Sequence, residues 1–138
     1  MRAPAEHNGA TAIDELRLPA LPAKLGVARE YAQRAATAFG LDADRCYEFV
    51  FAVNEAVTNA IRHGAPDEHG HIHLSVLTDR DRLTLAVRDY GTFSGFAPGC
   101  ATSTEHGRGF ALMARTMDAV QLSVGSGSTI VRLSKARA

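Results

Sequence analysis

One long amphipathic helix constrains the fold of this chain more than any other feature of the sequence. Its pattern runs without interruption from Asp42, a natural N-cap residue, to Gly64, which marks its end. Apolar residues recur at helical spacing and fill one inward-facing arc: Phe49, Val50, Val53, Val57, Ala60 and Ile61. The helix therefore lies against a core that the rest of the chain has to supply.

A polar stripe interrupts this arc. Glu55, Asn59 and His63 are spaced four residues apart, so they stack on one side of the helix. A carboxylate and a carboxamide beside a core are costly unless they bind something, and one candidate is a divalent cation with phosphate and a water or hydroxyl. A solvated helix edge is the alternative, and a histidine near a helix C-terminus is also favoured by the helix dipole.

Length and composition indicate a single soluble domain. The chain has 138 residues, 46% of them hydrophobic, so we expect one domain over residues 12–138 after a flexible N-terminal arm over residues 1–11. Fifteen basic and fifteen acidic residues cancel, which argues against general binding to nucleic acid or an anionic membrane. Residues 1–11 lack the apolar central run that a signal peptide has, and no stretch approaches the roughly eighteen apolar residues of a membrane span, so we expect neither export nor anchoring. With Cys46 and Cys100 lacking metal-ligand spacing, we expect a reduced cytoplasmic setting.

The remaining elements are delimited by Gly, Pro and Asp. Apolar residues alternate with polar ones on either side of the turn Asp79-Arg80-Asp81, which predicts a hairpin. The other expected elements are a strand at Ile13–Leu18, a helix from Pro22 to Gly40, a helix from Gly107 to Met117, and strands at Val120–Val124 and Ser128–Leu133. Too few strands alternate with helices for a wound parallel sheet. We expect an α+β fold, a two-layer α/β sandwich with one mostly antiparallel mixed sheet and helices on one face.

Two further motifs follow the hairpin. Asp89-Tyr90-Gly91 ends a strand, where the carboxylate can accept a hydrogen bond from an exocyclic amino group such as that of adenine, and the glycine gives a flat ring access to the backbone. Gly107-Arg108-Gly109 opens a helix, and N–H groups at a helix start bind phosphate, with added charge from Arg108. Taken singly, the first motif also fits a turn and the second a hinge.

Three histidines at alternate positions, His69, His71 and His73, invite a metal hypothesis because a strand points such residues to one side. Residues on one side of a strand lie too far apart for all three to share one tetrahedral ion. We therefore interpret them as a solvated strand face.

Taken together, the order of the three motifs resembles the GHKL (Bergerat-type) ATPase superfamily. The segment from Asn54 to Gly64 and the segment from Ser128 to Leu133 look like those of bacterial anti-sigma factor serine kinases, and the resemblance covers about residues 12 to 134. It implies ATP and Mg²⁺ as cofactors, with Glu55 as the general base on a serine hydroxyl and Asn59 as the ligand of the magnesium.

The same resemblance assigns the other site residues. Asp89 is expected to bind the adenine amino group, with its carboxylate supported by the hydroxyl of Thr129, and Gly91 is expected to leave room for the ring. Gly107 and Gly109 are expected to border the phosphates, at the end of a lid that begins at Thr92. His63 and Arg108 are further candidates for contacts with the nucleotide.

The function implied by this resemblance is that of an ATP/Mg-dependent serine protein kinase acting as an anti-sigma factor. Such a protein binds a sigma factor, phosphorylates an anti-anti-sigma antagonist of the STAS type and forms a homodimer. One alternative is a non-catalytic ATP-gated binding module, and one observation supports it: Glu105-His106 stand where kinase members often carry an arginine. The other is a detached histidine-kinase catalytic domain.

Overall fold

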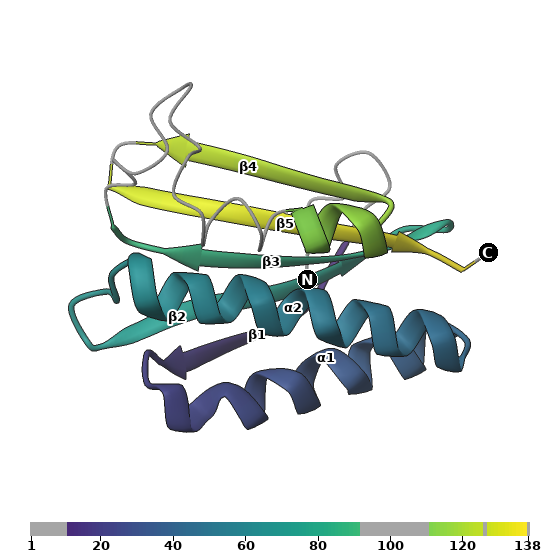
Figure 1. Cartoon of the computed structure of the whole chain (residues 1–138), viewed down its shortest axis with the longest axis horizontal. Coiled ribbons are helices and arrows are strands. Elements are labelled where there is room, and N and C mark those ends of the chain that lie inside the picture. Colours follow the sequence, from purple (N-terminus) through teal and green to yellow (C-terminus); the bar gives the residue numbers. More distant parts are fainter. Residues whose placement is uncertain (1–10, 92–110, 126, 138) are drawn as a thin grey trace, which may run out of the picture.

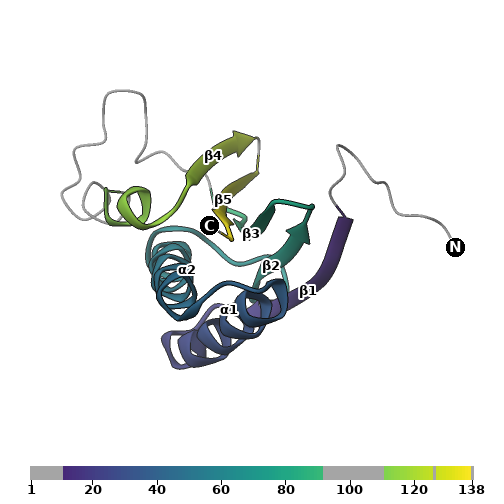
Figure 2. The same ribbon diagram turned by 90° about the vertical axis from the view of Figure 1, so that its right-hand side faces the viewer.

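A computed structural model of the chain shows one five-stranded sheet with helices on one of its faces (Figure 1). The structure describes residues 11–91, 111–125 and 127–137, and side chains from residue 14 onward. Viewed at right angles to this, both long helices lie on the same side of the sheet (Figure 2). The two-layer α+β fold expected from the sequence is confirmed.

The strands are β1 (Thr11–Pro19), β2 (His71–Thr78), β3 (Arg82–Asp89), β4 (Ala119–Gly125) and β5 (Ser128–Ala136). Their order across the sheet is β1-β2-β3-β5-β4, and each of the neighbouring pairs that the structure describes is antiparallel, where we expected a mixed sheet. The predicted hairpin is β2–β3; β2 alternates between buried and more exposed positions, and β3 does so except at Ala86, which is buried as well. The first strand is longer than predicted because β1 pairs with β2 along its whole length.

The helical layer consists of a short 3-10 turn at Pro22–Lys24, α1 (Leu25–Phe39), α2 (Ala43–His63) and a helix over residues 111–116. The predicted start of that last helix, at Gly107, lies outside the described residues. None of the helices within the described ranges is long and apolar enough to cross a membrane.

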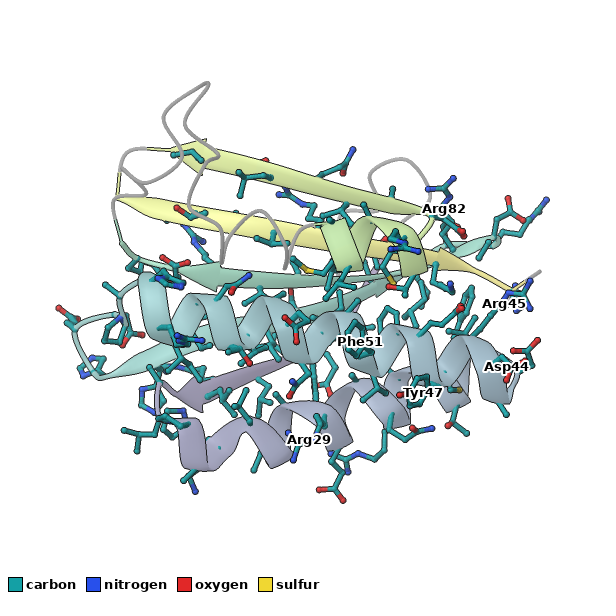
Figure 3. All side chains as sticks on the ribbon, viewed as in Figure 1. Arg29, Asp44, Arg45, Tyr47, Phe51 and Arg82 are labelled. Carbon is teal, nitrogen blue, oxygen red and sulfur yellow. The ribbon has the colours of Figure 1, made fainter. Side chains whose placement is uncertain are left out.

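Local signals in the sequence explain where the two long helices end and begin. Gly40 closes α1 with a φ of 99°, in the left-handed region that glycine enters without strain. The side chain of Asp42 then accepts a hydrogen bond of 2.8 Å from the backbone N–H of Arg45, as predicted for the N-cap of α2. Arg29, which Figure 3 labels on α1, donates to the side-chain oxygen of Asn54 on α2, 3.0 Å away, and so joins the two helices.

The core lies between the helices and the sheet. Its largest fully buried side chains come from both layers: Phe49, Val53, Val57, Leu18, Ile72, Leu74, Leu83, Leu85, Val87, Met113 and Leu133. Burying each large apolar side chain stabilises the fold by about 1.5–3 kcal/mol. The stripe that carries Asn59 is consequently fixed against the sheet by the apolar residues on either side of it.

The interpretation of the histidines as a solvated strand face was wrong for two of them. His71 and His73 are only partly exposed, because the loop before β2 folds over the start of that strand. Within the described ranges, no three His, Cys, Asp or Glu side chains are arranged to hold a metal ion.

Candidate functional site

A cavity lies where β3 ends and β5 begins, beneath the C-terminal half of α2. Its lining combines apolar side chains with three of the predicted site residues: Ala56, Asn59, Ala60, Gly64, Val87, Asp89, Met113, Leu122, Thr129 and Val131. Asp89 and Thr129 are direct partners in the register of β3 and β5, so the sheet itself places them side by side. The structure thus brings together two predicted site residues, Asn59 and Thr129, that are seventy positions apart in the chain.

Asp89 is the charged group of this cavity, and its side chain is held in place by the backbone. Only 7% of the residue is exposed. Its carboxylate accepts a 2.8 Å hydrogen bond from the N–H of Gly91 and another from the N–H of Ala65. Burial raises the pKa of Asp89, while these two N–H donors act in the opposite direction. A buried carboxylate that is fixed in this way is prepared to accept a hydrogen bond from a bound ligand.

Asn59 and Thr129 present unsatisfied polar atoms at the same cavity. The Nδ2 of Asn59 and the Oγ1 of Thr129 are buried, and neither has a hydrogen-bond partner among the residues that the structure describes. The hydrogen bond that we expected from the Thr129 hydroxyl to Asp89 is therefore not formed in this structure. Buried polar atoms without partners are costly, and a ligand that bonds to them offsets this cost.

Two glycines allow α2 and β3 to approach each other closely. A Cβ at Gly64 would lie 2.6 Å from Oδ1 of Asp89 and 2.7 Å from the carbonyl oxygen of Ala60. A Cβ at Gly91 would lie 3.0 Å from the backbone nitrogen of Ala65. The space at Gly91 thus accommodates the chain after α2, where we had expected room for a ring. Sequence reasoning treated Gly64 only as a helix stop and missed this role.

The other predicted site residues are less closely associated with the cavity. Glu55 is partly exposed, one helical turn before Asn59 on α2, and does not line the cavity. His63 lies one turn after Asn59, at the last residue of α2. Gly107, Arg108 and Gly109 lie outside the described residues, as does the predicted lid.

The cavity is narrow, with space of about 20 Å³, which is room for about one water molecule. A flat ring enters only when a side chain on its wall moves. Met113 is the candidate for this movement, because its unbranched thioether adapts to new neighbours more readily than the β-branched residues beside it.

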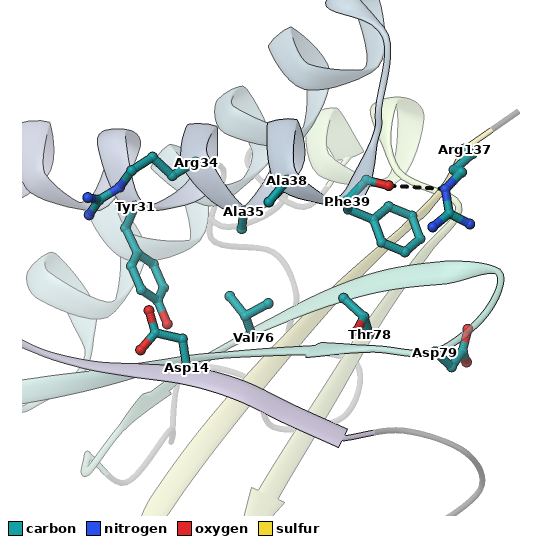
Figure 4. A pocket seen from close by; sticks show the side chains of 10 residues that line it. All are labelled: Asp14, Tyr31, Arg34, Ala35, Ala38, Phe39, Val76, Thr78, Asp79 and Arg137. Atoms are coloured by element: carbon teal, nitrogen blue, oxygen red, sulfur yellow. Dashed lines mark hydrogen bonds between the residues drawn. The ribbon is translucent and has the colours of Figure 1, made fainter.

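A larger hollow of about 550 Å³ lies elsewhere, between α1 and the start of β1 (Figure 4). The Tyr31 side chain points toward Asp14 there, and burial, followed by the charges of Asp14 and Glu15, raises the pKa of the Tyr31 hydroxyl. At its other end Arg137 donates to the carbonyl of Phe39. None of the predicted site residues lines this hollow, so its size does not make it the functional candidate.

Comparisons with known proteins agree with the motifs. The family model of the histidine kinase-like ATPase domain matches residues 18–135. The serine-protein kinase RsbW of Bacillus velezensis is 31% identical over 135 residues, which cover 87% of this chain and 84% of that protein. The anti-sigma F factor of Anoxybacillus flavithermus is 34% identical over 98 residues, covering 63% of this chain and 67% of that protein.

A solved structure supports the same fold. The RsbU and RsbW domains of a Mycobacterium tuberculosis protein match with a TM-score of 0.66 at 18% identity, over 89% of this chain and 31% of that longer one. Since the family model covers most of the chain and the RsbW relatives align along most of their own length, the chain belongs to the histidine kinase-like ATPase domain family, alongside the RsbW serine-protein kinases.

Proposed function

We propose that this chain is an ATP- and Mg²⁺-dependent serine protein kinase that acts as an anti-sigma factor. The observation that carries the proposal is the cavity in which the carboxylate of Asp89 lies beside unsatisfied polar atoms of Asn59 and Thr129. These groups fit the two ends of the proposed ligand, a purine with an exocyclic amine and a metal-bound phosphate chain.

Each group has a distinct part in binding. Asp89 accepts the adenine amino group, because its carboxylate is buried, oriented by Gly91 and Ala65, and offers acceptors only. Asn59 is the candidate Mg²⁺ ligand through its amide oxygen, since Mg²⁺ prefers oxygen donors, and its unpartnered Nδ2 is a donor for a phosphate oxygen. Bound there, Mg²⁺ supplies charge neutralisation for the phosphates. Thr129 offers its hydroxyl to the ring from β5.

Glu55 is the proposed general base. It lies one helical turn from Asn59 on the same stripe of α2 and is partly exposed, so a hydroxyl of a partner protein can reach its carboxylate. In this role Glu55 accepts the proton of the serine hydroxyl as that oxygen bonds to the terminal phosphorus of ATP, while the bond from this phosphorus to the bridging oxygen breaks and ADP leaves. Placing the base outside the cavity that holds the purine separates nucleotide binding from proton transfer.

Partners are proposed from the relatives. We propose that the chain binds a sigma factor, phosphorylates a STAS-type anti-anti-sigma protein and works as a cytoplasmic homodimer. The names of the relatives support a kinase and an anti-sigma role, and the balanced net charge supports protein partners over nucleic acid or membrane.

The test uses the purified chain with labelled ATP, Mg²⁺ and the candidate anti-anti-sigma protein. We expect acid-stable label on a serine of the partner. Glu55→Gln should abolish transfer and keep nucleotide binding, whereas Asn59→Ala should lose metal-dependent binding. Asp89→Asn is the matched change at the purine end and should remove ATP binding. The proposal fails if calorimetry shows no affinity of the folded wild-type chain for ATP or ADP.

Two other outcomes distinguish the alternatives. Binding without transfer by the wild type indicates an ATP-gated binding module, which the Glu105-His106 pair before Gly107 favours. Acid-labile label indicates phosphohistidine and hence a detached histidine-kinase domain.

A further inference from the structure

A chain of three polar side chains lies on the sheet face opposite the helices, behind the candidate nucleotide site. The Nε2 of His73 lies 2.9 Å from Oδ2 of Asp67, and the Nδ1 of the same ring lies 2.8 Å from the hydroxyl of Tyr90. The His73 and Tyr90 rings also meet edge to face, with centroids 5.2 Å apart. Arg88 covers the Tyr90 ring with its guanidinium carbon 5.2 Å from the centroid.

Asp67 fixes the direction of these hydrogen bonds. Its other oxygen accepts the backbone N–H groups of His69 and His71 at 2.8 and 3.0 Å, and these bonds together with His73 hold the pKa of Asp67 well below its usual range. Because Asp67 is a carboxylate and only accepts, Nε2 of His73 donates to it. In the neutral ring Nδ1 then accepts from the Tyr90 hydroxyl.

The hydrogen-bonded side chains of Asp67, His73 and Tyr90 join the same two backbone segments that hold Asp89. Tyr90 stands between Asp89 and Gly91, and its N–H donates to the carbonyl of Ala65 over 2.8 Å. The N–H of Ala65 in turn donates to the Asp89 carboxylate. Asp67 follows Ala65 by two residues, so the loop after α2 and the end of β3 are connected on both faces of the sheet.

We propose that Asp67, His73 and Tyr90 form a positioning relay that sets the place of the Asp89 carboxylate from the far side of the sheet. The relay rests on the proposed function, because its effect is on how well Asp89 meets the amino group of adenine. Its members are positioning residues, since none of them lines the cavity. Loss of the relay frees Tyr90 and the loop at Ala65 to shift, and Asp89 shifts with them.

Variants of the full chain test the relay by calorimetric titration with ATP and, separately, GTP. Tyr90→Phe removes one hydroxyl and keeps the ring, and His73→Leu removes both hydrogen bonds. Each should weaken ATP binding about fivefold, which is within the effect of one lost hydrogen bond. The double variant should bind ATP no more weakly than the single variant with the lower affinity, because both changes break the same network. His73→Gln should keep the affinity of the wild type, in contrast to His73→Leu, because the glutamine amide can donate to Asp67 and accept from Tyr90.

A matched control separates positioning from general destabilisation. Thr84→Val likewise removes a single hydroxyl, here from β3 itself. This hydroxyl lies 2.9 Å from the Ser134 hydroxyl, near the end of the strand away from Tyr90. Thr84→Val should lower the melting temperature as Tyr90→Phe does and leave ATP affinity unchanged. The relay variants should also reduce the preference for ATP over GTP, since Asp89 is the group that distinguishes an amino group from a carbonyl.

Three results would overturn the inference. The relay is excluded if the wild type binds ATP and both Tyr90→Phe and His73→Leu bind it equally well. It is also excluded if these variants weaken ATP and GTP binding by the same factor, because a displaced Asp89 must change selectivity. A wild-type chain that binds neither nucleotide overturns the proposed function and the relay together.

Discussion

Replacing Gly64 by alanine tests the close approach of α2 and β3 most directly. The new Cβ would lie 2.6 Å from Oδ1 of Asp89 and 2.7 Å from the carbonyl oxygen of Ala60. Carbon–oxygen contacts in proteins are about 3.3 Å or longer, and the Cγ of Asp89 lies closer still to the new Cβ, so the carboxylate must move by at least about 0.7 Å. Its 2.8 Å bond to the N–H of Gly91 then stretches toward about 3.5 Å, where a hydrogen bond no longer holds.

The free energy of unfolding should fall accordingly. Overpacking of this kind costs about 1–3 kcal/mol, and losing a hydrogen bond to a charged group costs about 1.5–3 kcal/mol, so we expect Gly64→Ala to be destabilised by about 3 kcal/mol. Urea denaturation measures the stability, and titration with ADP should show at least a tenfold loss of affinity because Asp89 has moved.

Gly70→Ala is the matched control, because it adds the same methyl group in the same loop. Gly70 has a φ of 86° and nothing within 4 Å of an added Cβ, so the substitution costs only the backbone strain of about 1 kcal/mol and should leave ADP binding intact. The steric reasoning is refuted if Gly64→Ala is as stable as the wild type, or no less stable than Gly70→Ala.

Two further predictions concern the N-terminal end of α2. The hydrogen bond from the backbone N–H of Arg45 lowers the pKa of Asp42 in the folded protein. The Asp42 carboxylate therefore stabilises the fold fully above its unfolded-state pKa, near 3.8, and this stabilisation is lost as the pH falls through the lowered folded-state pKa. Asp42→Ala should therefore be less stable than the wild type in urea at pH 7, and the difference should vanish in acid; a difference that persists contradicts the capping role. Lys135 is buried, with 8% of its side chain exposed, and donates to Glu48, which is 41% exposed, and to the carbonyl of Thr116. Glu48→Ala leaves the buried ammonium poorly compensated and should cost about 2 kcal/mol, more than Lys135→Met, and the reverse order in urea denaturation would disprove this asymmetry.

The architecture could be predicted because its signals are local. The helical spacing between Asp42 and Gly64 and the alternation around Asp79-Arg80-Asp81 each depend on neighbours within a few positions, and both elements form as expected. The first strand was predicted too short since its first residues have no alternating pattern of their own. They become a strand because β2 offers a partner as far as Thr78.

The candidate site was predictable where one element carries the spacing or the order of motifs indicates a family. Asn59 follows from the helical stripe, and Asp89 from the end of a strand; the structure places both at one cavity. Gly64 was missed because its function is steric and involves a side chain twenty-five positions away. No pattern within a single helix or strand reports a contact of that kind.

His73 shows the same limit in a more instructive form. Period-two alternation correctly assigned it to the outer face of β2, and from that face we inferred exposure to solvent. The inference failed because the outer face is not bare at this end of the sheet. Asp67 receives two backbone N–H groups from the residues that lead into β2, which folds the loop back toward the strand and brings a carboxylate to the imidazole. An outward position therefore predicts a solvated side chain only where no loop returns over it, and where one does return, a polar side chain on that face finds its hydrogen-bond partner in the loop.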